Sequence, residues 1–348
     1  MGDRQPDRQP DRLAEHTTLR LGGPADDWVT ATSQEQLVAA VSAADAAGTP
    51  VLLLGGGSNL VVSDDGFRGV VVEVATRGVA AGDDEGPQCG GVEVSVAAGE
   101  PWDVLVATAV EQGWLGIEAL AGIPGSVGAT PIQNVGAYGQ EVAQTIASVR
   151  VWDRTSHTVR TVAAADCGFG YRHSRFKADP GRHVVLEVTF QFRQGSLGAP
   201  VAYAELARAL GIAPGERAPL VDVRDAVLGL RRGKGMVLDP VDHDTWSAGS
   251  FFTNPVLDAA AVPDGAPAFV QPDGTVKTSA AWLIEHAGFA KGYGGPAALS
   301  SKHPLALTNR GSATTGQLLA LAREVRDGVE ARFGIRLVNE PMLVGCEL

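Results

Sequence analysis

Several short apolar runs in this chain have the length and pattern of β-strands. Val51 to Leu54 is an unbroken apolar run that leads into a glycine-rich turn, and Leu60 to Val62 and Val70 to Val72 are two further runs. Val92, Val94 and Val96 alternate with polar residues, as in a half-buried strand. Later in the chain, Val149–Trp152 and Val159–Val162 predict a hairpin around Thr155-Ser156, and Val184–Phe192 predicts another strand.

Helical patterns alternate with these strands. One predicted helix starts near Thr32, where Thr32 and Glu35 have the spacing of a capping box, and it ends at Gly48. A second runs from Pro101 to about Gln112, and a third from Ala281 to Ala287. The longest runs from about Thr315 to Phe333, and its apolar stripe predicts a core-facing helix. This mixture of strands and helices predicts an α+β fold.

The stretch from Glu118 to Gly139 has neither period. It contains Gly122, Gly125, Gly128, Gly136 and Gly139 together with Pro124 and Pro131, which excludes a regular helix or strand along its length. Apolar residues spaced through it argue against a solvated surface linker. We therefore predict an ordered loop whose backbone amides surround a ligand.

A second glycine-rich turn, Gly55-Gly56-Gly57-Ser58-Asn59, follows the apolar run that ends at Leu54. Backbone amides at such a turn can converge on phosphate oxygens. The turn is not a Walker A motif, because no Gly-Lys-Ser/Thr follows, and it lacks the Gly-x-Gly-x-x-Gly pattern of a dinucleotide fold.

Composition narrows the class of protein. The chain has 348 residues, of which 45% are hydrophobic and 20% charged, enough for a sizeable core and more than one domain. Its formal net charge of −12 argues against general nucleic-acid binding. Three cysteines without metal-ligand spacing support no disulfide framework and no metal site. Residues 1–12 repeat Asp-Arg-Gln-Pro and predict a disordered tail. Without a long apolar segment, we expect a soluble cytoplasmic protein with no membrane contact.

Several separated motifs resemble the UDP-N-acetylenolpyruvoylglucosamine reductase family, in family order from about Leu13 to the C-terminus. They are Arg20–Ala25, Gly55–Leu60, Ala121–Gly139, Tyr171–Phe176, Ser247–Phe252 and Asn339–Pro341. The resemblance implies a vanillyl-alcohol-oxidase (PCMH) type FAD-binding part at residues 13–200, with subdomains at about 13–80 and 81–200. It further implies an α+β substrate-binding domain at 201–348, whose last strand returns to the FAD-binding part.

The resemblance also implies the cofactors and the reaction. NADPH reduces bound FAD, which reduces UDP-N-acetylglucosamine enolpyruvate to UDP-N-acetylmuramate in peptidoglycan precursor synthesis. By the same resemblance, the two glycine-rich segments hold the FAD, and glycine amides without side chains suit its pyrophosphate. The implied FAD-binding residues are Gly55, Gly56, Gly57, Ser58, Asn59, Gly122, Ile123, Pro124, Gly125, Ser126, Gly128, Ala129, Asn134, Gly136 and Ala137.

Three residues match the family's catalytic positions. Arg172 matches the arginine that stabilises the enol-like intermediate, and its planar fork suits a carboxylate. Glu340 matches the glutamate with the same task, which requires a protonated carboxyl or one that orients other groups. Ser250 matches the proton donor. Taken singly, an arginine beside a tyrosine, a serine in a turn and a glutamate before proline are ordinary structural residues.

Substrate-binding residues follow from the resemblance as well. Tyr171 and Tyr203 match the subgroup that closes a tyrosine-bearing loop over the UDP group, and Lys234 matches a phosphate-contacting lysine. Tyr203 could instead be a core residue and Lys234 a solvated helix end. Asn254 and Lys277 are further candidates.

One pair of residues departs from the family. Lys302-His303 stands where some members have a substrate-contacting glutamine, so no role is assigned to His303. We expect a monomer. The alternatives are an FAD-dependent alcohol or sugar oxidase of the same superfamily, and a non-catalytic nucleotide-sugar binding protein.

Overall fold

The computed structural model describes residues 11–82 and 91–348. Most of the predicted tail, together with Cys89, lies outside these residues. Arg12 and Pro24 form an isolated antiparallel bridge.

Within the described residues the chain divides into two compact units. One contains 11–26, 57–68 and 234–348, and the other contains 27–56, 69–82 and 91–233. We call them the Ser250 unit and the Arg172 unit after the predicted catalytic residues they contain. Both units are discontinuous in sequence, whereas the predicted domains are continuous, so the domain boundaries stay a prediction.

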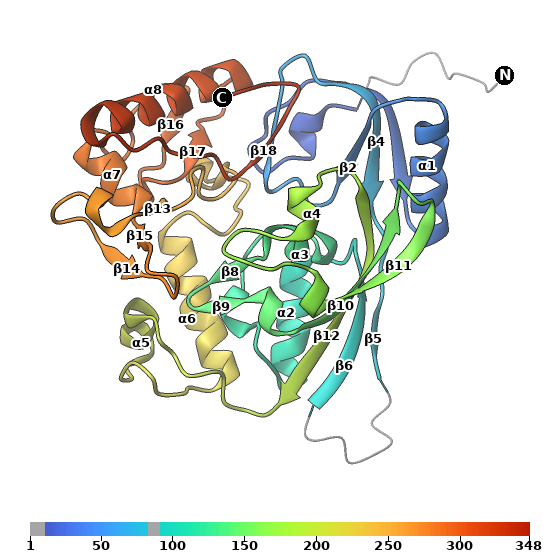
Figure 1. Ribbon diagram of the computed structural model, residues 1–348, viewed down its shortest axis with the longest axis horizontal. Coiled ribbons are helices and arrows are strands. Elements are labelled where there is room, and N and C mark those ends of the chain that lie inside the picture. Colours follow the sequence, from blue (N-terminus) through green and yellow to red (C-terminus); the bar gives the residue numbers. More distant parts are fainter. Residues whose placement is uncertain (1–10, 83–90) are drawn as a thin grey trace. The chain divides into compact units, whose positions relative to one another are not determined.

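The Arg172 unit is built on a six-stranded sheet, coloured cyan to green in Figure 1. Its main path runs β11-β10-β12-β6-β5, with β7 also paired to β12, and every pairing is antiparallel. The strands are β5 (Val79–Ala81), β6 (Gly91–Ala97), β7 (Trp114–Leu115), β10 (Ile146–Asp153), β11 (Thr158–Ala163) and β12 (His183–Gln194). The predicted hairpin and the predicted strand at 184–192 are therefore confirmed.

Helix α2 (Trp102–Glu111) contributes its apolar side to the core of this unit. Trp102 is almost fully buried, and its ring centroid lies 6.3 Å from that of Phe190 on β12. Phe190 in turn stacks on Phe192 at 5.3 Å. Pro101 is the residue before the helix rather than part of its first turn, where it fixes an extended backbone.

A second layer of the same unit combines helix α1 (Gln34–Ala46) with the sheet β1-β4-β2 (Ala25–Ala31, Phe67–Val74 and Val51–Leu54). Leu37 and Val41 of α1 share a buried cluster with Val70 and Val72 of β4. The predicted capping box is wrong, because the N-cap is Ser33, whose hydroxyl accepts a hydrogen bond from Gln36 N–H. The Gln36 side chain accepts from the N–H of Thr32, the residue before the N-cap.

The Ser250 unit has its core under two helices, α7 (Ala280–His286) and α8 (Thr315–Phe333), coloured orange and red in Figure 1. The predicted stripe of α8 is confirmed: Leu318, Leu321, Val325 and Val329 are all buried. This unit also contains the pairs β16-β17 (Ala297–Leu299, Leu307–Asn309) and β18-β3 (Met342–Val344, Leu60–Val62). Its remaining sheet is β13-β15-β14 (Val256–Leu257, Val276–Thr278, Ala268–Val270). Strand β18 runs parallel to β3, so the end of the chain pairs with an early strand.

The central stretch is ordered but not wholly irregular. It contains a four-residue helix, α3 (Thr130–Gln133), with proline near its start, where no N–H is needed. The predicted loop is therefore interrupted by α3, by the 3-10 helices Glu118–Leu120 and Val127–Ala129, and by the short strand Gly136–Ala137. The Arg172 unit also contains the short elements β8 (Gly136–Ala137), β9 (Gln140–Glu141), α4 (Arg175–Ala178) and α5 (Ala204–Leu210), and the 14-residue helix α6 (Leu220–Gly233). Among the described residues, no helix combines the length and apolarity needed to span a membrane.

Candidate active site

The glycine-rich turn after β2 packs closely against its surroundings. In the Arg172 unit, a Cβ on Gly55 would lie 2.5 Å from Ser126 Oγ, and one on Gly56 would lie 2.7 Å from Gly125 Cα. In the Ser250 unit, a Cβ on Gly57 would lie 1.9 Å from the carbonyl oxygen of His16. A side chain at Gly56 or Gly57 would displace backbone, and one at Gly55 would displace the Ser126 side chain, so glycine fits all three positions.

These glycines also leave hydrogen-bond donors available. No group in residues 11–82 and 91–348 accepts a hydrogen bond from the backbone N–H of Gly55, Gly56 or Gly57. Backbone N–H groups are obligatory donors, so a run of them without protein partners suits an anion such as a pyrophosphate. The backbone donors of this turn therefore fit the pyrophosphate of the predicted FAD.

The central loop is anchored at its first glycine. Gly122 N–H donates to Asp103 Oδ1 at 2.6 Å, and the Gly122 carbonyl accepts from Arg231 Nη2 at 3.4 Å. Burial lowers the pKa of Arg231 to about 10, although Tyr138 and Asp103 oppose this shift. Gly122 has a φ of +70°, a left-handed conformation that glycine adopts without strain.

Left-handed backbone recurs at non-glycine residues of the same region. Asn134, Tyr138 and Arg172 have φ values of +43°, +50° and +51°. Such residues cost free energy unless their surroundings hold them, and they gather at functional sites. Asn134 is held by its side chain, whose Nδ2 donates to Glu141 Oε2 at 3.0 Å and to the Gly170 carbonyl at 2.9 Å.

The Arg172 guanidinium is oriented by the central loop. Its Nη2 donates to the Gly136 carbonyl at 2.8 Å, and its Nη1 donates to the Asn134 carbonyl at 3.4 Å. The ring of Tyr171 lies beneath the guanidinium, 5.7 Å from centroid to Cζ. Two predicted FAD-binding residues thus position the predicted catalytic arginine.

In the Ser250 unit, backbone hydrogen bonds join the segment that contains Ser250 to the segment that contains Glu340. Phe252 and Asn339 form an antiparallel bridge, and Glu340 N–H donates to the Phe251 carbonyl at 2.8 Å. Phe251 N–H donates to the Leu305 carbonyl at 2.7 Å. Phe251 and Phe252 are each 1% exposed, so the backbone on either side of Ser250 is fixed by burial as well.

The Ser250 hydroxyl is half-buried and has no hydrogen-bond partner in the described part of the chain. A hydroxyl is both donor and acceptor, so one in this position is available to a bound molecule.

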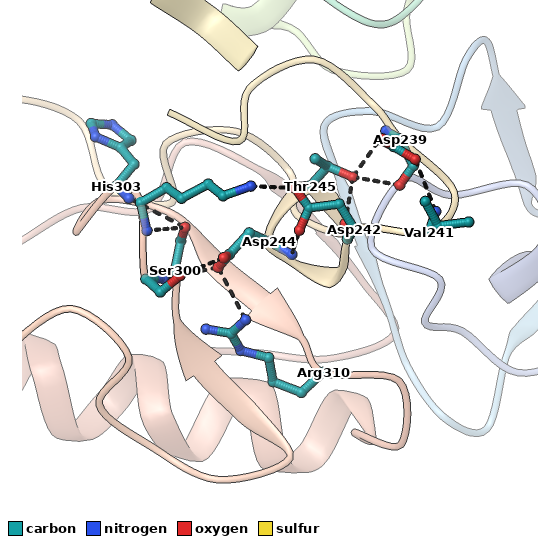
Figure 2. Close-up of polar contacts among 10 residues, drawn as sticks. Asp239, Val241, Asp242, Asp244, Thr245, Ser300, His303 and Arg310 are labelled. Atoms are coloured by element: carbon teal, nitrogen blue, oxygen red, sulfur yellow. Dashed lines mark hydrogen bonds and ion pairs between the residues drawn. The ribbon is translucent and has the colours of Figure 1, made fainter. Parts of the chain in front are cut away.

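A buried carboxylate supports the segment that precedes Ser250. Figure 2 shows Asp244 between the turn at Ser300 to His303 and Arg310. Asp244 accepts hydrogen bonds from Ser301 N at 2.8 Å and Ser301 Oγ at 2.5 Å, and it pairs with Arg310 Nη1 at 3.1 Å. Burial alone would raise the pKa of Asp244, but the hydrogen bonds from Ser301 and Ser300 and the charge of Arg310 together lower it.

The turn with His303 belongs to the same cluster. His303 N–H and Lys302 N–H both donate to Ser300 Oγ, at 3.2 and 3.0 Å. The Lys302 ammonium pairs with Asp242, which is more exposed than Asp244. Sequence reasoning did not find Asp244, because its partners are distant in the chain.

The predicted substrate residues have different surroundings. Tyr203 is 52% exposed and precedes α5, which excludes the core alternative. Its ring lies edge-on to Tyr138 at 5.8 Å, so Tyr138 is a candidate that sequence reasoning did not single out. Asn254 Oδ1 accepts from Ala280 N–H at the start of α7. Lys277 is in the middle strand β15, opposite Val256 and Phe269. Lys234 directly follows α6 and is partly exposed.

The described residues contain no group of histidine, cysteine and carboxylate side chains that could hold a metal ion. Cys167 and Cys346 are free thiols, and burial is the main cause that raises the pKa of each.

Comparison with known proteins defines the class. A family model described as an FAD binding domain matches residues 26–162. The solved UDP-N-acetylenolpyruvylglucosamine reductase of Thermus caldophilus is similar over 96% of this chain and 97% of its own, with a TM-score of 0.65 and 26% sequence identity. The chain is therefore an FAD-dependent oxidoreductase, and the predicted α+β fold of vanillyl-alcohol-oxidase (PCMH) type is confirmed.

A second model, described as the UDP-N-acetylenolpyruvoylglucosamine reductase C-terminal domain, matches residues 239–344. The UDP-N-acetylenolpyruvoylglucosamine reductases of Cutibacterium acnes and Streptomyces avermitilis are 59% and 58% identical to this chain. These matches cover 97% of this chain in both cases, and 90% and 94% of the two relatives. The chain belongs to the UDP-N-acetylenolpyruvoylglucosamine reductase family.

Proposed function

We propose that this chain reduces UDP-N-acetylglucosamine enolpyruvate to UDP-N-acetylmuramate with NADPH and FAD, and that Arg172, Ser250 and Glu340 are its catalytic residues. Family membership and the FAD-binding domain support the reaction. One observation carries the residue assignment: the Ser250 hydroxyl has no partner among the described residues, and it lies in a fixed segment whose backbone is hydrogen-bonded to Glu340.

When bound, FAD supplies a hydride, obtained from NADPH, to the terminal carbon of the enolpyruvyl group. The task of Ser250 is to give a proton to the adjacent carbon, which completes the lactyl ether. A serine hydroxyl is a weak acid, so this donation requires a strongly basic carbon in the intermediate and a fixed donor position. The backbone bonds of Phe251 meet the second requirement.

Arg172 stabilises the charge that develops as the reaction proceeds. Negative charge reaches the substrate carboxylate, and a guanidinium offers that group two parallel donors. The bonds from Arg172 to the Gly136 and Asn134 carbonyls hold the guanidinium before substrate arrives, so little reorganisation is required. Glu340 assists as a protonated carboxyl donor or by orienting neighbouring donors.

Backbone donors of the two glycine-rich segments would hold the FAD. In this assignment Gly55 to Asn59 bind the pyrophosphate, and the predicted positions between Gly122 and Ala137 line the ring system. The crowding around Gly56 and Gly128 supports the assignment, because other backbone segments approach these two positions closely.

For the UDP group, we propose Tyr171, Tyr203 and Lys234, with Asn254 and Lys277 as further contacts. The exposed ring of Tyr203 supports a role in covering the ligand. Because Asn254 Oδ1 already accepts from Ala280 N–H, the Asn254 amide nitrogen would be the group that faces the substrate.

We also propose that the protein is a monomer that acts in the cytoplasm, where its precursor pathway operates. The acidic net charge of −12 favours a dispersed protein. Light scattering on the purified chain would yield about its monomer mass of 36.0 kDa, and a mass near twice that value would refute the monomer.

Visible absorbance under anaerobic conditions tests the reaction. The flavin bands should bleach with one equivalent of NADPH and return on addition of the enolpyruvyl sugar nucleotide. Bands that return only when air is admitted would favour an oxidase instead, and protein that neither contains nor accepts flavin would refute the FAD assignment.

A further inference from the structure

The turn from Thr17 to Leu21 has no role in the proposed reaction. Its last two residues belong to the Arg20–Ala25 motif. Thr17 braces the turn internally, because its Oγ1 donates to the Leu21 carbonyl at 2.9 Å and its carbonyl accepts from Arg20 N–H at 3.1 Å. Arg20 has a left-handed φ of +53°. A non-glycine residue in this conformation indicates that the surroundings determine the turn.

Thr18 connects two functional segments of the Ser250 unit. Its backbone N–H donates to the carbonyl of Gly57 at 3.2 Å, and its hydroxyl donates to the carbonyl of Ser247 at 2.7 Å. Thr18 is 5% exposed, so neither bond is exchanged freely with water. Gly57 belongs to the turn assigned to the FAD pyrophosphate, and Ser247 begins the motif that contains Ser250.

The connection is short and stiff at both ends. The carbonyl of His16 packs directly on Gly57, and Ser247 bridges to Thr308 of β17. A second link runs in parallel through Asn309, which is 3% exposed. Asn309 Nδ2 donates to the Leu19 and Arg20 carbonyls at 3.1 and 3.3 Å, and its backbone N–H donates to the Trp246 carbonyl at 3.0 Å.

We infer that Thr18 is a positioning residue, which holds the segment of the proton donor Ser250 in register with the FAD-binding turn at Gly57. This inference rests on the proposed function. Transfer of a proton to one particular carbon depends on a donor position fixed to fractions of an ångström. Thr18 touches neither reacting group, and it acts through the carbonyls of Gly57 and Ser247.

Thr18→Val tests the inference, because valine keeps the shape of threonine and replaces its hydroxyl with a methyl group. Anaerobic rapid mixing would measure flavin reduction by NADPH and flavin reoxidation by the enolpyruvyl sugar nucleotide separately. We expect reoxidation to slow about tenfold, the effect of one buried hydrogen bond and the carbonyl it leaves unpaired, while reduction is unchanged. The solvent deuterium isotope effect on reoxidation should rise, because a displaced donor makes proton transfer more limiting.

Two control variants separate positioning from general stability. Thr18→Ser keeps the hydroxyl and should restore the ratio of the two rates. Thr17→Val removes a neighbouring buried hydroxyl that bonds only within the turn, so it should lower the melting temperature without changing that ratio. If Thr18→Val yields no folded protein, Thr18→Cys replaces it as a weaker donor, and an intermediate ratio is expected.

The outcomes distinguish this inference from the proposed function. A wild-type ratio in Thr18→Val, together with blocked reoxidation in Ser250→Ala, would overturn the role of Thr18 alone. Normal reoxidation in Ser250→Ala would instead refute the proposed proton donor, whatever Thr18→Val does.

Discussion

The Arg172 guanidinium is oriented by backbone carbonyls of the central loop, whereas the segment around Ser250 is held by backbone hydrogen bonds and by a buried carboxylate that pairs with Arg310. In the first region, left-handed residues and backbone carbonyls orient a charged side chain. In the second, Phe251 and Phe252 are bonded to Leu305 and Asn339, and Asp244 pairs with Arg310 below. A catalytic group is thus fixed in two ways: loop carbonyls bind the Arg172 side chain directly, whereas the backbone that carries Ser250 is itself fixed by hydrogen bonds to distant segments.

The largest expected effect is that of Arg172→Lys, which keeps the charge and removes the fork. An ammonium cannot satisfy both loop carbonyls and a substrate carboxylate in the same geometry. We expect flavin reoxidation by the enolpyruvyl substrate to fall about 100- to 1000-fold, with reduction by NADPH unchanged. Single-turnover absorbance measures both steps, and near-normal reoxidation would contradict the bidentate role.

Asp244→Asn addresses the side-chain support of the second region. It leaves the partly buried Arg310 without its carboxylate, so the free energy of unfolding should fall by about 3 kcal/mol. Asp244 has a lowered pKa, so its stabilisation is present above the unfolded-state value of about 3.9 and is lost as pH falls below it. Denaturant unfolding at several pH values should therefore show the gap between wild type and variant narrowing below about pH 4. A difference in the free energy of unfolding that does not depend on pH would contradict a stabilising role of the ion pair.

Gly128→Ala addresses the backbone packing of the first region. The new Cβ would lie 2.6 Å from the Cβ of Ala98, and its Cα and carbonyl oxygen are each 3.0 Å away. We expect the free energy of unfolding to fall by about 2 kcal/mol and FAD to be bound more weakly, because the backbone must shift. Gly139→Ala is the matched control, since its Cβ would meet nothing within 4 Å and only its φ of +87° is strained, which costs about 1 kcal/mol. Equal losses in both variants would contradict a role for close packing.

The smallest expected effect is that of Asp242→Asn, which breaks the more exposed pair with Lys302 in the cluster of Figure 2. Exposed ion pairs contribute little to stability, so we expect the free energy of unfolding to fall by less than about 0.5 kcal/mol and turnover to be unchanged. Thermal unfolding of both variants checks that Asp244→Asn is the more destabilising. A larger loss of stability in Asp242→Asn would indicate that the pair of Asp242 with Lys302 holds the segment instead.

Local patterns were sufficient to predict many of the regular elements, although helix α6 was not among them. The run at Val51–Leu54 and the stripe of α8 depend on residues within a few positions of one another, so periodicity finds them. Where neighbours compete for one role, the sequence is less decisive: Ser33 rather than Thr32 caps α1. Helix α3 was missed because flanking glycines and Pro131 suggested an irregular loop.

The candidate site depends on long-range contacts, and this limits its prediction. Arg172, Ser250 and Glu340 were recognised from motifs that resemble the family, whereas the bonds that hold them join distant segments. Thr18 with Ser247, and Asp244 with Arg310, have no local sequence signal. These contacts can be identified only from the folded structure.

The most direct test of the account is single-turnover reoxidation of the reduced flavin in Ser250→Ala, with reduction by NADPH in the same variant as the internal control. The account predicts normal reduction and reoxidation slowed by about 100-fold or more, the contribution of a positioned proton donor. Reoxidation at the wild-type rate would contradict the assignment of Ser250, and loss of both steps would indicate a structural role instead.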